Sequence, residues 1–331
     1  MNEFLSLSFE EVIERLEAPA DTLILFHRGP DADAVGSAFA MKKVLSDLGS
    51  RAFCVCADEV PARLLFLTDG EQESVLPEAI PEDFDVARIV SVDTASPSQL
   101  GALWELYEGQ IDLMIDHHGM GEPYADHYIR PDAAATGELM FDLVKHLATA
   151  GRVEITDALC TNLYAAISSD TGGFRFSNVT PDTHLRAAEL IASSIDCAKI
   201  NQKLFDTKTI EQLRAQAAGI SNLRTFADGR VAVITFPYAL KAALGLKDEH
   251  LETLVDVARM VEGVEVAVAV RQFQPENIFR ISTRSSSDVD VSKVCATFGG
   301  GGHTRAAGCT IEGETIEDAM MLVVREIEKQ M

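Results

Sequence analysis

Residues 22–37 read TLILFHRGPDADAVGS, and this stretch indicates the fold of the N-terminal part of the chain. Its first five residues form a continuous apolar run, which is typical of a strand buried on both faces of a sheet. A polar loop follows, and residues 38–48 then carry apolar side chains at helical spacing until Gly49 ends the helix. Residues 51–56 are expected to form a second strand. Strand, loop, helix and strand in this order predict a parallel α/β sheet.

The same alternation continues along the chain. Further elements of the N-terminal part are strands at 88–93 and 111–115 and helices at 4–18, 135–149, 156–169 and 181–194. In the helix over 4–18, Phe4 and Leu5 are expected to share the apolar side. Residues 195–220 are polar with a helical pattern, which favours a linker helix.

The C-terminal part has a pattern of its own. Its predicted elements are strands at 230–236, 264–272 and 277–283 and helices at 248–260, 290–297 and 315–329. The predicted organisation is therefore a parallel-sheet domain over 1–195, a helical linker over 196–220 and a smaller α/β domain over 221–331, with a cleft between the two domains.

The composition limits the classes of protein to consider. Of the 331 residues, 47% are hydrophobic and 24% are charged, as in ordinary globular domains. The apolar runs are too short to span a membrane and the N-terminus lacks the pattern of a signal peptide, so we expect a cytoplasmic protein with no membrane partner. The formal net charge of -24 argues against binding of long duplex nucleic acid, whereas a short nucleotide needs only one basic pocket.

Side chains that can bind a metal ion follow three of the predicted strands and end one predicted helix. They are His27, Asp31 and Asp33, then Asp93, then Asp116, His117 and His118, and finally Asp170. In open α/β sheets, ligands bind outside the carboxyl ends of the strands, so these side chains are expected to gather in one crevice. Imidazole and carboxylate are good ligands for Mn, Fe and Zn, and carboxylates so close would repel one another without a cation. The count suits two metal ions that share one carboxylate and leaves one histidine over.

Each of these segments also has a plainer interpretation when it is taken alone. Asp33 could cap the following helix, Asp93 could be a turn residue, and the two histidines at 117 and 118 could lie on a surface turn. No single one of these interpretations accounts for all the segments. Two metal ions a few ångströms apart can generate hydroxide from water and hold both the attacking and the leaving oxygen of a phosphate.

Residues 299–308, GGGGHTRAAG, are the most distinctive stretch of the C-terminal part. Glycines let the backbone approach a ligand closely and offer amide donors to an anion. Arg280 and Arg284 lie on or just after a predicted strand, and arginine can bind phosphate in a bidentate way. The stretch favours a phosphate or nucleotide site, and the alternative is a flexible turn.

Together these segments resemble the DHH phosphoesterase superfamily. Residues 27–37, Asp93, residues 116–118 and Asp170 look like its first four motifs in the right order, and 291–308 resembles its DHH-associated domain. Within the superfamily, the chain looks most like the small nanoRNase/pAp phosphatase proteins, which carry only these two domains. By this resemblance the first domain is catalytic and the second binds the substrate.

The resemblance also implies roles for single residues. One ion would be held by His27, Asp31 and Asp93, and the other by Asp33, Asp93, His117 and Asp170, with Asp93 bridging the two. Asp116 would orient His117, and His118 would face the scissile phosphate as a substrate contact or proton donor. The expected cofactor is two Mn2+ ions. The terminal nucleotide would be held by Arg280, Arg284, Gly301, Gly302 and His303.

The function implied is hydrolysis of phosphoester bonds in short oligoribonucleotides, linear dinucleotides or pAp (3′-phosphoadenosine 5′-phosphate), and the family suggests a homodimer. Alternatives are a pyrophosphatase or polyphosphatase, a cyclic-dinucleotide phosphodiesterase, and a non-enzymatic nucleotide-binding protein. A pyrophosphate site would be expected to present more Lys and Arg than the C-terminal part offers. A protein without activity would be expected to have lost ligands, whereas every expected ligand position is filled.

Overall fold

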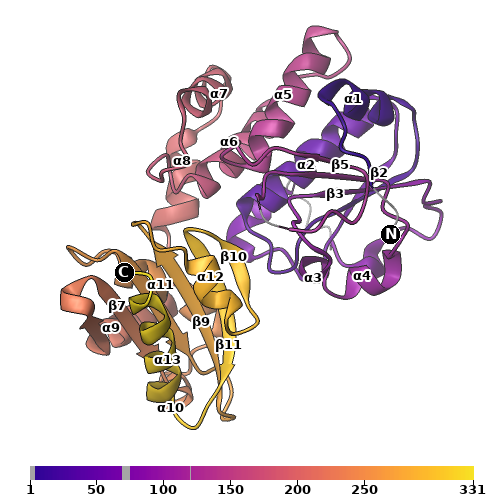
Figure 1. The fold of residues 1–331 in the computed structure, drawn as a ribbon. Coiled ribbons are helices and arrows are strands. Elements are labelled where there is room, and N and C mark those ends of the chain that lie inside the picture. Colours follow the sequence, from indigo (N-terminus) through magenta and orange to yellow (C-terminus); the bar gives the residue numbers. More distant parts are fainter. Residues whose placement is uncertain (1–3, 69–74, 120) are drawn as a thin grey trace. The chain divides into compact units, whose positions relative to one another are not determined.

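The structure is a computed structural model that describes residues 4–68, 75–119 and 121–331. The chain divides into two compact units, Met1–Thr207 and Lys208–Met331, and the division falls inside the segment 196–220. Each unit has its own sheet and its own hydrophobic core (Figure 1).

The first unit alternates strands and helices along the chain. Its strands are β1 (Thr22–Leu25), β2 (Ala52–Val55), β3 (Arg88–Val92), β4 (Leu113–Asp116) and β5 (His127–Ile129). Its α-helices are α1 (Phe9–Glu17), α2 (Ala32–Asp47), α3 (Pro97–Leu100), α4 (Ala102–Tyr107), α5 (Thr136–Thr149), α6 (Asp157–Asp170), α7 (Pro181–Ile191) and α8 (Cys197–Asn201). Short helical turns are η1 (Ala62–Leu67), η2 (Pro77–Ala79) and η3 (Gln202–Asp206).

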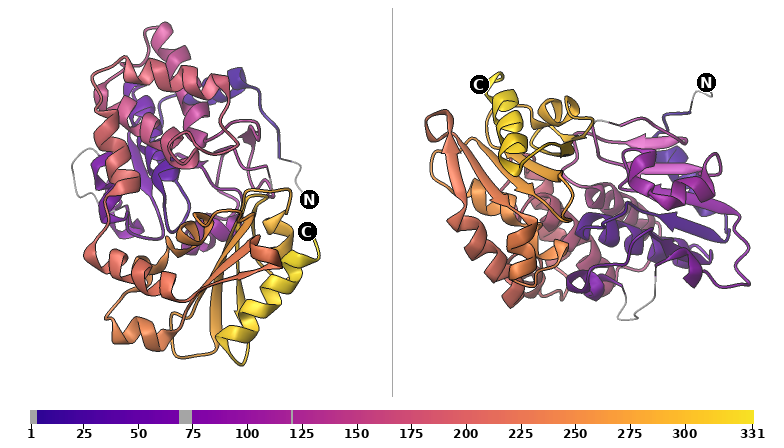
Figure 2. Two further views of the ribbon diagram at one scale, coloured as in Figure 1. Left: turned by 90° about the vertical axis from the view of Figure 1, so that its left-hand side faces the viewer. Right: turned by 90° about the horizontal axis from the view of Figure 1, so that it is seen from below.

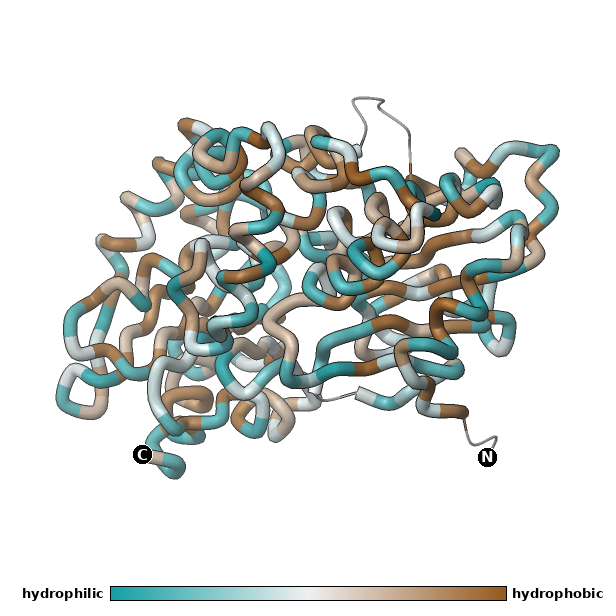
Figure 3. Tube along the Cα trace, turned by 90° about the horizontal axis from the view of Figure 1, so that it is seen from above, coloured by the Kyte–Doolittle hydropathy of each residue, from teal (hydrophilic) through white to brown (hydrophobic). Residues whose placement is uncertain are grey.

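Among the described residues, the first sheet has five strands in the order β2-β1-β3-β4-β5, all parallel. Helices α1, α2, α5 and α6 pack on one face and α3 and α4 on the other (Figure 1). Because both faces are covered, β1, β3 and β4 are buried along their whole length, and their apolar runs show brown in Figure 3. The predicted parallel α/β sheet is confirmed. Its order brings the carboxyl ends of β1, β3 and β4 side by side.

The first helix is shorter than predicted. Ser8 caps it by accepting a hydrogen bond from the backbone N–H of Glu11, whose side chain in turn accepts from the Ser8 N–H. Such a capping box sets the first turn of a helix, so the prediction of a helix from residue 4 is wrong at its start. Residues 5–7 instead pair with His127 of β5 as extended chain, and Phe4 and Leu5 are exposed.

The segment 195–220 is not one helix. After α8 and η3 the chain leaves the helical conformation, and α9 (Ile210–Ser221) starts afresh with Thr209 as its cap. The segment predicted as a helical linker is thus helical in two parts, with a break between Asp206 and Ile210. Its polar composition hid the new start, because a Thr with Gln three residues later also occurs inside helices.

The second unit starts with α9. Its strands are β6 (Leu223–Phe226), β7 (Val231–Phe236), β8 (Val266–Arg271), β9 (Ile278–Ser285), β10 (Gly301–His303) and β11 (Ala306–Glu312). Its other helices are α10 (Tyr238–Ala243), α11 (Leu254–Arg259), α12 (Val291–Ala296) and α13 (Ile316–Glu328), with short turns η4 (Ala227–Gly229) and η5 (Asp248–Leu251).

Within residues 208–331, all of which are described, the sheet has six strands in the order β10-β11-β9-β8-β7-β6. The pair β7–β8 is parallel and the other pairs are antiparallel. Helices α12 and α13 pack on one face, and α9 and α11 on the other (Figure 2). The predicted smaller α/β domain is confirmed, although β6, β10 and β11 were not predicted. Over the described ranges, none of the helices combines the length and apolar character needed to cross a bilayer.

Candidate metal centre

Asp93 directly follows β3 and lies at the middle of the predicted ligands. Its backbone has a φ of 54°, in the left-handed region that Asp tolerates better than most residues. Its N–H donates to the carbonyl oxygen of Ile115 at 3.0 Å, and its Oδ1 accepts from the Thr136 hydroxyl at 2.8 Å. The residue is 2% exposed, so its side chain is held in one orientation inside the unit.

The two carboxylate oxygens of Asp93 face two different histidines. Oδ2 lies 3.7 Å from Nε2 of His27, and Oδ1 lies 3.8 Å from Nε2 of His117. Atoms that bind one ion at about 2.1 Å lie about 3 to 4 Å from one another. The arrangement therefore allows a single carboxylate to serve two ions.

His27 and Asp31 form a first group with Asp93. Nε2 of His27 lies 3.7 Å from Oδ1 of Asp31, and Nδ1 lies 2.9 Å from the backbone oxygen of Arg28, which fixes the ring. Oδ1 of Asp31 also accepts from the backbone N–H groups of residues 33 and 34 at the start of α2. The capping role that the sequence left open for Asp33 thus belongs to Asp31.

Asp33, His117 and Asp170 form a second group with Asp93. Nε2 of His117 lies 3.9 Å from Oδ2 of Asp33 and 3.3 Å from Oδ2 of Asp170, the last residue of α6. Asp33 is fully buried and accepts hydrogen bonds of 2.7 and 2.8 Å from the first two backbone N–H groups of α5. A helix N-terminus carries positive partial charge, so it stabilises this carboxylate.

The electrostatics of the two groups fit a bound cation. Burial, and then the charges of Asp93 and Asp170, raise the pKa of Asp33 well above its usual value. Burial and the charge of Asp31 raise the pKa of Asp93 to about 6. A divalent ion would offset this repulsion, and a set of carboxylate oxygens and imidazole nitrogens suits Mn, Fe and Zn.

The same carboxylates favour the protonated, positively charged form of the neighbouring histidines. Burial alone would lower the pKa of His27, but the hydrogen bond and charge of Asp31 and the charge of Asp93 raise it to about 10. Burial is likewise outweighed at His117, whose pKa is raised well above its usual value by Asp170, Asp33 and Asp93. Protons on these rings neutralise the carboxylates in the absence of metal.

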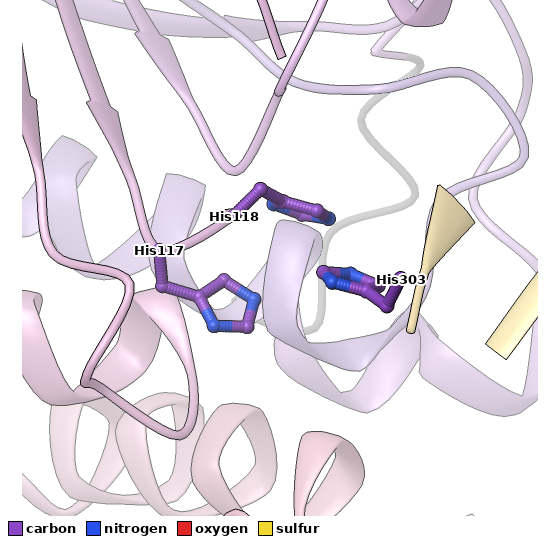
Figure 4. A group of neighbouring side chains, drawn as sticks. All are labelled: His117, His118 and His303. Carbon is purple, nitrogen blue, oxygen red and sulfur yellow. The ribbon is translucent and has the colours of Figure 1, made fainter. Parts of the chain in front are cut away.

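Asp116 and His118 form a pair beside the second group. Oδ1 of Asp116 lies 2.6 Å from Nδ1 of His118 and also accepts from the backbone N–H of His117 at 2.9 Å. Figure 4 shows the rings of His117 and His118 side by side, and their centroids are 4.7 Å apart. We expected Asp116 to orient the ring of His117. In the structure, the side chain of Asp116 is instead hydrogen-bonded to the ring of His118. Nδ1 of His117 lies 3.3 Å from the Ala133 carbonyl oxygen.

The segment 133–138 contacts Asp33, Asp93 and His117, and the sequence did not single it out. Its backbone and hydroxyl donors bind Asp33 and Asp93, and its Ala133 carbonyl lies against His117. Asn178 donates to the carbonyl oxygens of both Ala134 and Asp170, which ties the segment to α6. Backbone donors leave no signature in residue type, so only the tertiary structure reveals them.

In the second unit, β9 places Arg280, Ser282 and Arg284 on one face of the sheet. Arg271, the last residue of β8, is paired with Arg280 in the register and donates from Nη2 to the Ser282 hydroxyl at 2.6 Å. Burial lowers the pKa of Arg271 to about 10, and the charges of Arg280 and Arg284 act in the same direction. Arg271 was not among the residues predicted from the sequence, although a charged residue at the end of the apolar run VAVAVR was the signal available.

The second half of the glycine run belongs to strand β10, whereas Gly299 lies in the turn after α12. Gly301, Gly302 and His303 pair with Gly308, Ala307 and Ala306 of β11. A Cβ at position 302 would lie 2.5 Å from the Ala306 carbonyl oxygen, and the φ of 138° there also favours glycine. The two strands can approach only because the side chain is missing.

Comparisons with known proteins identify the family of the chain. Residues 21–167 match the DHH family N-terminal domain, and residues 230–329 match the DHHA1 domain. A bifunctional oligoribonuclease and PAP phosphatase NrnA from Thermus thermophilus is 31% identical over 323 residues, which cover 97% of this chain and 93% of that protein. The chain belongs to the DHH family. The resemblance noted in the sequence is thereby confirmed.

Other relatives and a solved structure extend the comparison. The Bacillus subtilis protein of the same name is 26% identical and covers 88% of this chain and 90% of its own length. The cyclic-di-AMP phosphodiesterase PdeA of Listeria monocytogenes is 24% identical and covers 98% of this chain, which matches only 49% of that longer protein. A crystal structure of an exopolyphosphatase-related protein from Bacteroides fragilis, 21% identical, superposes with a TM-score of 0.87 over 99% of this chain and 98% of the other, which shows the shared fold.

Proposed function

We propose that the protein is a phosphoesterase that hydrolyses short oligoribonucleotides, linear dinucleotides and pAp with the help of two divalent ions. The observation that carries the proposal is the placement of Asp93, whose two oxygens face the separate groups around His27 and His117. Relatives that match nearly the whole chain are named as oligoribonuclease and PAP phosphatase, which supports this substrate class.

The proposed ligands are divided between the two groups. His27, Asp31 and Asp93 would hold one ion, and Asp33, Asp93, His117 and Asp170 the other. We propose Mn2+ as the ion, since a mixed set of carboxylate and imidazole suits it. When bound, the pair would activate a water molecule and neutralise charge on the phosphate.

The protein's own residues would position and protonate the substrate. His118, held by Asp116 at Nδ1, presents its Nε2 on the other side of the ring and can deliver a proton to the leaving oxygen. In the second unit, Arg280 and Arg284 would bind the phosphate of the terminal nucleotide, and Gly301, Gly302 and His303 would contact its base. The proposal includes a cytoplasmic homodimer, which size-exclusion chromatography with light scattering would test.

The decisive experiment is turnover of a substrate panel by the purified protein with Mn2+. The panel contains labelled di- to pentaribonucleotides, pAp, cyclic di-AMP and pyrophosphate. We expect mononucleotide from the oligoribonucleotides and phosphate from pAp, and no product with Asp93→Ala. Turnover of pyrophosphate alone would favour the pyrophosphatase alternative. Equal, negligible activity of wild type and Asp93→Ala would contradict the proposal.

A further inference from the structure

Glu138 is a buried carboxylate beside the candidate metal centre. It lies in the first turn of α5 and is 4% exposed. Its Oε2 accepts a hydrogen bond of 3.2 Å from the backbone N–H of Ala134, and Nη1 of Arg186 lies 3.7 Å from the same oxygen. Its Oε1 is buried without a hydrogen-bond partner among the described residues. Such a group costs folding free energy, so its presence calls for a role beyond helix packing.

Glu138 is connected to His117 through one peptide group. The Ala134 N–H that donates to Glu138 and the Ala133 carbonyl that lies 3.3 Å from Nδ1 of His117 belong to the same peptide. When Nδ1 carries the proton and donates it to this carbonyl, Nε2 presents its lone pair toward Asp33, Asp93 and Asp170. The hydrogen bonds then run in one direction, from the ring through the peptide to the carboxylate.

Hydrogen bonds in such a chain strengthen one another. The peptide C–N bond has partial double-bond character, so a carboxylate that accepts from its N–H makes the carbonyl oxygen a stronger acceptor. A carboxylate that accepts from a ligating histidine fixes the tautomer of the ring and raises its basicity. In this protein a peptide stands between the two groups and can transmit the same influence.

We infer that Glu138 is a positioning residue that acts on His117 through the Ala133–Ala134 peptide, fixes the Nδ1–H tautomer and strengthens Nε2 as a metal ligand. This inference rests on the two-ion centre proposed above. It assigns to the start of α5 a second task besides donating two N–H groups to Asp33.

Asp142 supplies a matched control. It lies one turn further along α5 and accepts hydrogen bonds of 3.0 and 2.7 Å from Arg186, the same arginine that approaches Glu138. Asp142→Asn therefore removes a negative charge from the same helix and the same arginine without touching the peptide. An effect that came only from Arg186 or from the stability of α5 would appear in both variants.

The test is a titration with Mn2+ of four proteins: wild type, Glu138→Gln, Glu138→Ala and Asp142→Asn. The electron paramagnetic resonance signal of free Mn2+ measures how much of the ion is bound at each step. We expect one of the two binding steps to weaken about 10-fold in Glu138→Gln, whose amide oxygen still accepts, and up to about 100-fold in Glu138→Ala. Asp142→Asn should bind like wild type. In the proteins loaded with diamagnetic Zn2+, nitrogen-15 and proton spectra of the His117 ring should show a strongly hydrogen-bonded Nδ1–H in wild type and a weaker hydrogen bond in Glu138→Gln.

The outcomes separate the two proposals. Wild-type metal affinity and a wild-type Nδ1–H signal in Glu138→Gln, or an equal loss of affinity in Asp142→Asn, would overturn the role of Glu138 while the wild-type protein still binds metal and turns over substrate. If the wild-type protein binds no divalent ion, both the proposed metal centre and the proposed role of Glu138 are overturned. Since Glu138→Gln preserves the size of the side chain, the test does not depend on whether Glu138→Ala folds.

Discussion

Oδ1 of Asp116 accepts a hydrogen bond of 2.6 Å from Nδ1 of His118, and Asp116 is fully buried. Burial by itself would lower the pKa of His118, but this bond and the charges of Asp93 and Asp116 raise it. The ring can therefore keep a proton near neutral pH, as a general acid must.

Replacement of the Asp116 carboxylate should lower the pKa of His118 without removing the metal ions. In Asp116→Asn, the pKa of His118 should fall, so the alkaline limb of the profile of kcat against pH should move to lower pH. We expect kcat to drop by roughly 100-fold or more, since general acid catalysis contributes that much. Metal content, measured by mass spectrometry of the dialysed protein, should stay near the wild-type value. An unchanged pH profile would contradict the pairing.

The two adjacent histidines should respond differently to removal. His117→Ala deletes the ring whose Nε2 lies among three carboxylates, so the protein should lose metal. His118→Ala should retain metal and lose rate, because its ring is bonded to Asp116. Metal content and kcat are measured on both variants. Equal loss of metal from the two would show that their roles are assigned wrongly.

The stoichiometry of bound metal tests the position of Asp93. Asp93→Asn weakens a ligand that faces both groups, so equilibrium dialysis should find both ions bound more weakly. Asp170→Asn removes a partner of the His117 group alone, and one ion should remain. A loss of only one ion from Asp93→Asn would argue that its two oxygens do not serve separate ions.

Metal affinity should rise with pH. In the metal-free protein the pKa of His27 is raised to about 10 and that of Asp93 to about 6, so ligands carry protons that an ion must displace. Affinity should increase by up to about tenfold per pH unit for each proton displaced between about pH 6 and pH 9. Calorimetry in two buffers of different ionisation enthalpy measures the protons released. Binding that is independent of both pH and buffer would refute the pKa shifts.

A glycine controls the packing of the helices that carry the ligands. A Cβ at Gly36 in α2 would lie 2.5 Å from the backbone oxygen of Asn162 in α6. We expect Gly36→Ala to lower the free energy of unfolding by about 1–3 kcal/mol, since overpacking outweighs the better helix propensity of alanine. Gly313→Ala is the control, because its nearest neighbour would be 3.8 Å away. Urea unfolding measures the free energy of unfolding of both variants. If Gly36→Ala is as stable as wild type, α2 and α6 can move apart without cost.

The sheet and the gathering of its acidic strand ends could be predicted because they depend on local patterns. The apolar runs of β1, β3 and β4 are short, continuous and followed by polar residues, which identifies strands buried on both faces. The rule that ligands bind at the carboxyl ends then brings His27, Asp93 and His117 together without knowledge of a single distance.

The remaining features depend on contacts between distant segments. The ring bonded to Asp116 is that of His118, a choice set by how the loop after β4 turns. Thr136 and Glu138 match no metal-ligand pattern, and their contacts run through the backbone N–H groups of Thr136 and Ala134 and through the Thr136 hydroxyl. Strand β10 consists of residues that are poor strand formers, and only its pairing with β11 makes it one.

The backbone of Asp93 narrows the set of residues that this position can accept. A φ of 54° is readily adopted by Gly, Asn and Asp, and the place between two histidines requires a carboxylate. Aspartate alone meets both conditions. Glutamate, the usual conservative exchange, keeps the carboxylate but strains the backbone at this φ and has a longer side chain. Asp93→Glu should therefore have a lower free energy of unfolding than Asp93→Asn, even though it keeps the charge.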